Sequence, residues 1–180
     1  MILTRNKDIF LPLEERTALA NTRNADLFIS IHVNAHPKPA TSGIETFFLN
    51  LATNTEAMRV AARENATSSH NISDLQDILT DLMQNSKIQE SSVLAGYVQK
   101  KLSSGLGGRY ATKDLGVKQA PFYVLIGAEM PAILAEISFI SNPDEAKRLR
   151  QDNYLNEIAR EIAAGVAGYA EHQATAALKL

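Results

Sequence analysis

The hydrophobic and polar positions of the chain follow two different periods. Compact apolar runs of strand length occupy residues 25–32, 43–50, 121–126 and 132–140. Apolar residues three and four positions apart instead predict helices after Pro12, across residues 54–106 and after Pro143. Strands separated by helices are typical of an α/β fold, and near-continuous apolar strands favour parallel pairing. We therefore expect a mixed, largely parallel sheet flanked by helices on both faces.

Local signals refine the central helical region. A capping box at residues 73–76 precedes an apolar stripe from Leu75 to Met83, and a second stripe runs from Val93 to Leu102. The glycine-rich residues 105–108 predict a flexible joint after these helices.

The last helical region should begin at the capping residue Asn142, and the alanine-rich tail after His172 is expected to fray. Its spacing predicts one buried face, formed by Leu155, Ile158, Ala159, Ile162 and Val166.

Composition narrows the class of protein. The chain has 180 residues, of which 45% are hydrophobic and 21% charged, as in an average single soluble domain. A net charge of −2 gives no electrostatic basis for binding nucleic acid, and no apolar run approaches the ~18–20 residues of a membrane span. The absence of cysteine excludes disulfides, thiolate zinc sites and cysteine nucleophiles. Residues 1–8 lack the apolar region of a signal peptide.

Two residues of the predicted strands carry candidate chemistry. His32 ends an apolar run and meets a polar loop, where ligands of α/β sheets tend to lie. Its imidazole could bind a metal, carry a proton, or simply be hydrogen-bonded to the loop. Glu136 lies inside an apolar run, where a carboxylate is costly unless it is paired, protonated or bound to a metal, although strand alternation could turn it to solvent. We expect Glu45 to face solvent and His36 to be exposed.

Short stretches through nearly the whole chain resemble, in the same order, the zinc-dependent N-acetylmuramoyl-L-alanine amidases that split bacterial septal peptidoglycan. These stretches are residues 3–5, 13–16, 20–21, 25–35, 43–46, 117–120, 124–125, 134–136 and 139–142. The resemblance implies that residues 1–180 form a single amidase-like catalytic domain.

The resemblance also implies a chemistry for the two candidate residues. In that family two histidines and one glutamate hold a zinc ion, and a second glutamate acts on the zinc-bound water. His32 matches the last of the metal ligands, and Glu136 matches the catalytic glutamate. Three protein ligands leave one zinc position open for water, whose pKa falls toward neutrality. The bond cut is the amide between the lactyl group of N-acetylmuramic acid and L-alanine of the stem peptide.

The resemblance also implies a cofactor, a substrate and a biological role. The cofactor would be Zn²⁺ and the substrate peptidoglycan, used in cell-wall remodelling and daughter-cell separation. The family also implies a location in the periplasm or cell envelope.

The sequence departs from the family at its beginning. The family's first strand, with a glycine-rich motif that carries a histidine, and the helix with the ligand glutamate would precede Ile2. We therefore expect an N-terminally shortened domain with weak or absent zinc binding and little activity. The neighbours of the missing strand would keep unpaired backbone groups unless another segment fills the gap.

Residues 53–92 resemble the helical insert of the cell-division branch of the family. There a glutamate of the insert occupies the open zinc position until an activator protein moves it. Residues 63–66 resemble the corresponding signature, which makes Glu64 the expected inhibitory ligand. Glu64 could instead be an exposed helical residue, and the stripe from Leu75 to Met83 could latch over the cleft or cover an ordinary core.

A second hypothesis belongs to a different class. A metal-free relative could bind peptidoglycan or a division partner without hydrolysis. The absent N-terminal ligands fit such a binding module, whereas His32 together with Glu136 fits the enzyme better, because a pure binding module needs neither.

Overall fold

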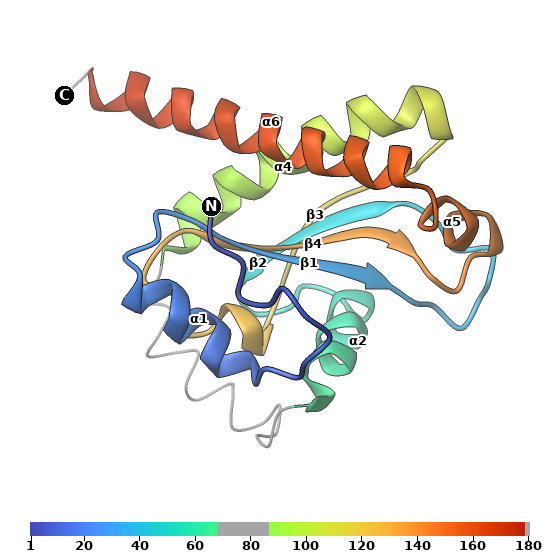
Figure 1. Cartoon of the computed structure of the whole chain (residues 1–180), viewed down its shortest axis with the longest axis horizontal. Helices are drawn as coiled ribbons and strands as arrows, with labels where there is room; N and C mark the ends of the chain where they lie inside the picture. Colours follow the sequence, from blue (N-terminus) through green and yellow to red (C-terminus); the bar gives the residue numbers. More distant parts are fainter. Residues whose placement is uncertain (68–86, 179–180) are drawn as a thin grey trace. The chain divides into compact units, whose positions relative to one another are not determined.

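Four strands form the sheet of the computed structural model, which describes residues 1–67 and 87–178 (Figure 1). Their spatial order is β1-β4-β2-β3, with the bounds β1 Phe28–Asn34, β2 Ile44–Leu49, β3 Asp114–Ala120 and β4 Ala132–Phe139. Phe28 N–H donates to the Pro131 carbonyl at 3.0 Å, where β1 and β4 begin. Ile140 N–H donates to the Asn34 carbonyl at 2.8 Å, where both end. β1 and β4 are therefore parallel neighbours.

Along the chain, the described helices lie before β1, between β2 and β3, and after β4. They are α1 Leu13–Thr22, α2 Thr55–Glu64, α4 Ile88–Tyr110, α5 Pro143–Arg148 and α6 Asp152–Ala177, with short 3-10 turns at η1 Asn65–Thr67 and η2 Tyr123–Leu125. The Asn142 side chain caps α5, as predicted, by accepting the N–H groups of Asp144 and Glu145. None of the described helices is both long and apolar enough to cross a membrane. The α/β fold with a mixed, mostly parallel sheet is confirmed.

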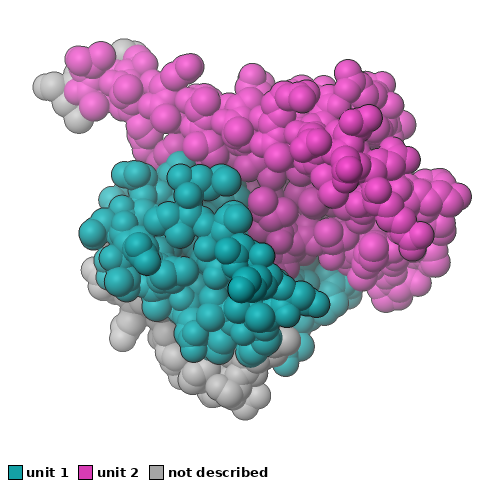
Figure 2. All heavy atoms as spheres, viewed as in Figure 1, with its two compact units in different colours: residues 1–30, 48–91, 118–133 teal, residues 31–47, 92–117, 134–180 magenta. Residues whose placement is uncertain are grey.

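The chain divides into two compact units, which Figure 2 colours separately. Unit 1 comprises Met1–Ser30, Phe48–Ser91 and Lys118–Ile133, and unit 2 comprises Ile31–Phe47, Ser92–Val117 and Leu134–Leu180. Each of the four strands contributes residues to both units. The parts of β1 and β4 that carry His32 and Glu136 belong to unit 2.

The run predicted as a strand at residues 121–126 is instead a buried 3-10 turn, η2, in unit 1. The buried amide of Asn65 donates to the Pro121 carbonyl at 2.7 Å and accepts the N–H of Tyr123 at 2.8 Å. One side chain thus satisfies backbone groups that a strand would offer to a neighbour. The strand prediction is wrong because the apolar run reflects burial and not extended backbone.

The flexible joint predicted at residues 105–108 is also wrong, since these residues lie inside α4. A Cβ at Gly105 would meet the side chain of Glu161 on α6, and a Cβ at Gly165 would lie 2.6 Å from the Cα of Val98. The glycines therefore let α4 and α6 pack closely within unit 2, and they serve helix packing instead of a hinge.

The last helix differs from the prediction in its buried face and in its length. Leu155 is 41% exposed and Ala159 is also exposed. The buried positions are Tyr154, Glu157, Ile158, Ile162, Gly165 and Tyr169. The contact at Gly165 turns this face toward α4, and the helix continues to Ala177, past the expected fraying at His172. The capping box at 73–76 and the stripe from Leu75 to Met83 lie outside the described residues.

Candidate metal centre

His32 and Glu136 lie on neighbouring parallel strands. His32 is half-buried near the end of β1, whereas Glu136 is fully buried in β4, with 0% of its surface exposed. One ring nitrogen of His32 and one carboxylate oxygen of Glu136 lie within 4.8 Å of each other. Both faces of β4 are buried, so strand alternation does not bring Glu136 to solvent. The structure thus brings together the two residues that the sequence singled out.

Glu64 is the last residue of α2, and its side chain is 19% exposed. Its carboxylate lies 3.4 Å from the guanidinium of Arg63. Burial lowers the pKa of Arg16 on α1, and the negative charge of Glu64 acts in the opposite direction. Glu64 belongs to unit 1, whereas His32 and Glu136 both belong to unit 2. An imidazole and a carboxylate, as His32 and Glu136 offer within unit 2, are donors that a divalent metal accepts.

Asn34, at the end of β1, fixes a carboxylate on β2. Its side-chain amide donates to Glu45 Oε1 at 2.7 Å, and both residues are buried. The expectation that Glu45 faces solvent is wrong. β2 is an interior strand of the sheet with every residue buried, so both of its faces are covered and alternation along it exposes nothing.

Glu145, on α5, is a buried carboxylate that sequence reasoning missed. Its Oε2 accepts the N–H of Phe139 at 2.6 Å, and its Oε1 accepts the N–H of Gly43 at 2.9 Å. Burial raises the pKa of Glu145, against the lowering effect of these two N–H groups. Glu145 therefore ties the end of β4 to the beginning of β2. The sequence does show a glutamate three residues after the capping residue Asn142. That spacing predicts the start of a helix, but it does not reveal that the carboxylate bonds to two strands.

His36 was expected to be exposed, and the structure corrects this too. It is half-buried, and its Nδ1 accepts the N–H of Lys38 at 2.9 Å. Its own N–H donates to the hydroxyl of Ser141 at 2.9 Å. These bonds fix the loop that follows β1, because a short turn of this kind leaves backbone N–H groups that need acceptors.

Comparison with known proteins identifies a family whose members this chain resembles. A model of the family described as N-acetylmuramoyl-L-alanine amidase matches residues 1–168. N-acetylmuramoyl-L-alanine amidase AmiA of Escherichia coli (strain K12) is 34% identical over 178 residues, covering 93% of this chain and 60% of the relative. AmiC of Escherichia coli O6:H1 is 35% identical over 183 residues, covering 97% of this chain and 43% of the relative. The chain thus spans about half the length of these relatives.

Solved structures agree with the sequence comparison. The N-acetylmuramoyl-L-alanine amidase from Clostridium difficile 630 superposes with a TM-score of 0.67 at 28% identity. The match covers 93% of this chain and 70% of that one. The catalytic domain of the amidase CwlV from Bacillus (Paenibacillus) polymyxa var. colistinus gives a TM-score of 0.65 at 25% identity. The chain belongs to the N-acetylmuramoyl-L-alanine amidase family.

Proposed function

We propose that the chain hydrolyses the amide bond between the lactyl group of N-acetylmuramic acid and L-alanine of the peptidoglycan stem peptide. The observation that carries the proposal is the pairing of His32 with Glu136, whose ligand atoms lie within 4.8 Å on adjacent strands. The two side chains supply an imidazole ligand and a carboxylate suited to acid–base chemistry. Membership of the amidase family supports the choice of bond.

His32 would supply a ring nitrogen to a zinc ion at this site, since an imidazole is a common zinc ligand. A carboxylate oxygen of Glu136 lies within 4.8 Å of that ring nitrogen. When bound, zinc supplies Lewis acidity toward water and toward the scissile carbonyl.

Glu136 would act as general base and then as general acid. Its carboxylate takes a proton from the attacking water and returns it to the amide nitrogen as the C–N bond breaks. The products are a lactyl carboxylate on the glycan and a free amino group on L-alanine. Because β4 is buried along its whole length, the strand holds Glu136 in a fixed position for both transfers.

Glu64 would have a regulatory role in the same proposal. Glu64 is the last residue of α2. In the proposal, residues 53–92 are the regulatory insert of a single catalytic domain over residues 1–180. A carboxylate on the open zinc position would exclude water and keep the site inactive. An activator protein that moves this segment would open it. The setting is cell-wall remodelling and daughter-cell separation, in the periplasm or cell envelope.

Digestion of purified peptidoglycan by the purified chain tests the proposal, with zinc content measured in parallel by metal analysis. Mass spectrometry should detect stem peptides that begin with a free L-alanine amino group. Glu136→Gln should lower the rate by about 100-fold or more, because it removes the proton acceptor. His32→Ala should lower both the rate and the zinc content. Glu15→Gln, an exposed position on α1, is the matched control and should change neither.

Two outcomes would overturn the proposal. Undiminished cleavage by Glu136→Gln would remove this residue from the chemistry. Binding of peptidoglycan without release of L-alanine peptides, in a chain loaded with zinc, would favour the binding module over the enzyme.

A further inference from the structure

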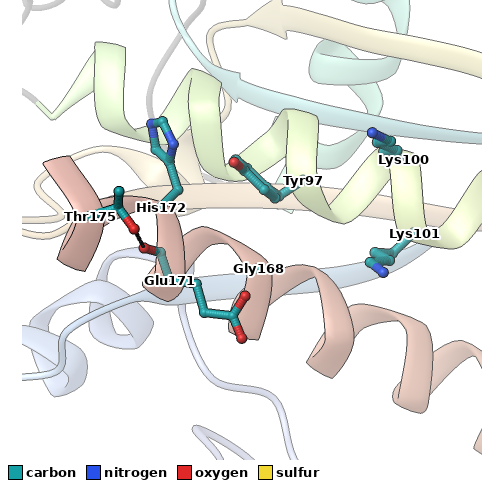
Figure 3. Close-up of a pocket in the computed structure, with 7 residues that line it drawn as sticks. All are labelled: Tyr97, Lys100, Lys101, Gly168, Glu171, His172 and Thr175. Carbon is teal, nitrogen blue, oxygen red and sulfur yellow. Dashed lines mark hydrogen bonds between the residues drawn. The ribbon is translucent and has the colours of Figure 1, made fainter.

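A groove of about 490 Å³ lies between α4 and α6 within unit 2 (Figure 3). One wall is formed by Tyr97, Lys100 and Lys101, three and four positions apart on one face of α4. The other wall comes from α6, where Gly168, Glu171, His172 and Thr175 repeat the same spacing. The volume falls in the range of about 300–1,000 Å³ typical of small-molecule sites.

The aromatic part of the groove is fixed by packing. A Cβ at Gly168 would lie 3.0 Å from Cδ1 of Tyr97, so the glycine lets the tyrosine ring rest against the backbone of α6. The ring centroid of Tyr97 lies 6.4 Å from that of Tyr169 and 5.6 Å from that of His172. A ring held on two sides offers a preorganised apolar surface to a ligand.

Charge is distributed unevenly along the groove. Figure 3 shows Lys100 and Lys101 at one end, and His172 with Glu171 toward the other. Within residues 1–67 and 87–178 neither lysine ammonium group is engaged in an ion pair, so both are available to an anion. The carboxylate of Glu171 accepts hydrogen bonds but repels anions. A matching ligand therefore carries an anionic group at one end and hydroxyl or amide donors at the other.

An N-acetylated sugar with a carboxylate meets all three requirements. A pyranose ring has an apolar C–H face for Tyr97, while its hydroxyl and amide N–H groups can donate to Glu171. The carboxylate would pair with Lys100 or Lys101. A polyphosphate has the negative charge but neither the apolar face nor the donors, so Glu171 disfavours it.

We infer that this groove binds the glycan from which stem peptides have been removed. The inference rests on the proposed function, in which water splits the lactyl amide and leaves a carboxylate on each muramic acid. The peptide-bearing glycan has an uncharged amide at that position, so only the product offers the two lysines a carboxylate next to the sugar ring. The groove would hold the enzyme on strands that it has already processed.

Titration of the purified chain, followed by NMR, with a tetrasaccharide of alternating N-acetylglucosamine and N-acetylmuramic acid bearing free lactyl carboxylates tests this inference. Chitotetraose, which lacks the lactyl group, should bind at least about tenfold more weakly. The double variant Lys100→Gln/Lys101→Gln and the single variant Tyr97→Ala should each weaken tetrasaccharide binding by a similar factor. Lys147→Gln, an exposed lysine of α5, is the matched control and should bind as the wild type does.

Equal affinity for chitotetraose, unchanged binding by the double lysine variant, or tighter binding of polyphosphate would overturn the inference. None of these titrations requires hydrolysis. If the chain cleaves peptidoglycan and the groove variants bind like wild type, only the groove inference fails. If the groove binds the tetrasaccharide and no cleavage occurs, only the proposed function fails.

Discussion

Glu145 accepts the backbone N–H of Phe139 at 2.6 Å, at the end of the strand that carries Glu136. The second oxygen of the same carboxylate accepts the N–H of Gly43 at 2.9 Å, just before β2. Two strands whose ends are far apart in sequence are thus held by one side chain of α5. The bond fixes the end of β4, the same strand in which Glu136 lies three residues earlier.

Replacing Glu145 should destabilise the protein. Glu145→Gln puts an NH₂ group where one of the two N–H donors now finds an oxygen, so a buried donor loses its acceptor. We expect the free energy of unfolding at pH 7, measured by urea denaturation, to fall by about 1–3 kcal/mol. Asp144→Asn, an exposed neighbour on α5, should change it by no more than about 0.5 kcal/mol. Equal effects of the two variants would mean that the contact contributes nothing.

The same carboxyl group should make stability depend on pH. Burial raises the pKa of Glu145 in the folded protein above its ordinary value of 4.5. The folded state therefore holds the proton more tightly than the unfolded chain. The stabilisation from this proton is complete below pH 4.5 and is lost as the pH rises through the folded pKa. Urea midpoints of wild type and Glu145→Gln should diverge as the pH is lowered through this window. A constant difference would contradict the raised pKa.

A matched pair of glycine substitutions tests the packing of α4 against α6. A Cβ at Gly165 would lie 2.6 Å from the Cα of Val98, which is backbone and cannot swing aside. Gly165→Ala should therefore lower the free energy of unfolding by about 1–3 kcal/mol. At Gly96, inside α4, nothing lies within 4 Å of the added atom, so Gly96→Ala should raise it by about 0.5–1 kcal/mol. Thermal unfolding of both variants should show shifts of opposite sign.

The proposed role of Glu64 predicts opposite effects on zinc affinity and on hydrolysis. Glu64→Gln should weaken zinc binding, because a carboxylate is a better ligand than an amide, and should raise peptidoglycan cleavage, because the open position is freed for water. Glu56→Gln, on the same helix with its side chain 50% exposed, should affect neither. Zinc titration with a chelating indicator and the L-alanine release assay provide the two measurements. Slower cleavage by Glu64→Gln would assign Glu64 a supporting role in place of an inhibitory one.

The strands that bury apolar side chains could be predicted from the sequence, and the polar edge strand could not. β1, β2 and β4 each show as a compact apolar run. β3 lies at the edge of the sheet, is mostly half-exposed, and contains Gly116 at φ +80°. Its beginning is fixed by Gln99 of α4, which donates to Asp114 at 2.5 Å and to the Ile44 carbonyl at 3.1 Å. Contacts of that kind leave no periodic signal near β3.

The residues of the candidate site also divide into those that the sequence could indicate and those that it could not. His32 and Glu136 stand out because a polar group in or beside an apolar run needs an explanation, so the sequence could point to them. Glu45 stands in an equally apolar run, and its burial depends on the interior place of β2, which only the strand order reveals. Glu145 bonds backbone groups, and backbone N–H groups are identical in every residue except proline. No pattern of side chains could have assigned its partners.

The contact between Gly165 and Val98 has a consequence for biosynthesis. The two residues are separated by more than sixty positions, and unit 2 is completed by Leu134–Leu180. The apolar face of α4 emerges from the ribosome long before α6 can cover it. Gly165 and Gly168 lower the helix propensity of the middle of α6, so docking against α4 stabilises this part of the helix. We expect unit 2 to fold after synthesis of the last helix, and the nascent chain to need chaperone protection until then.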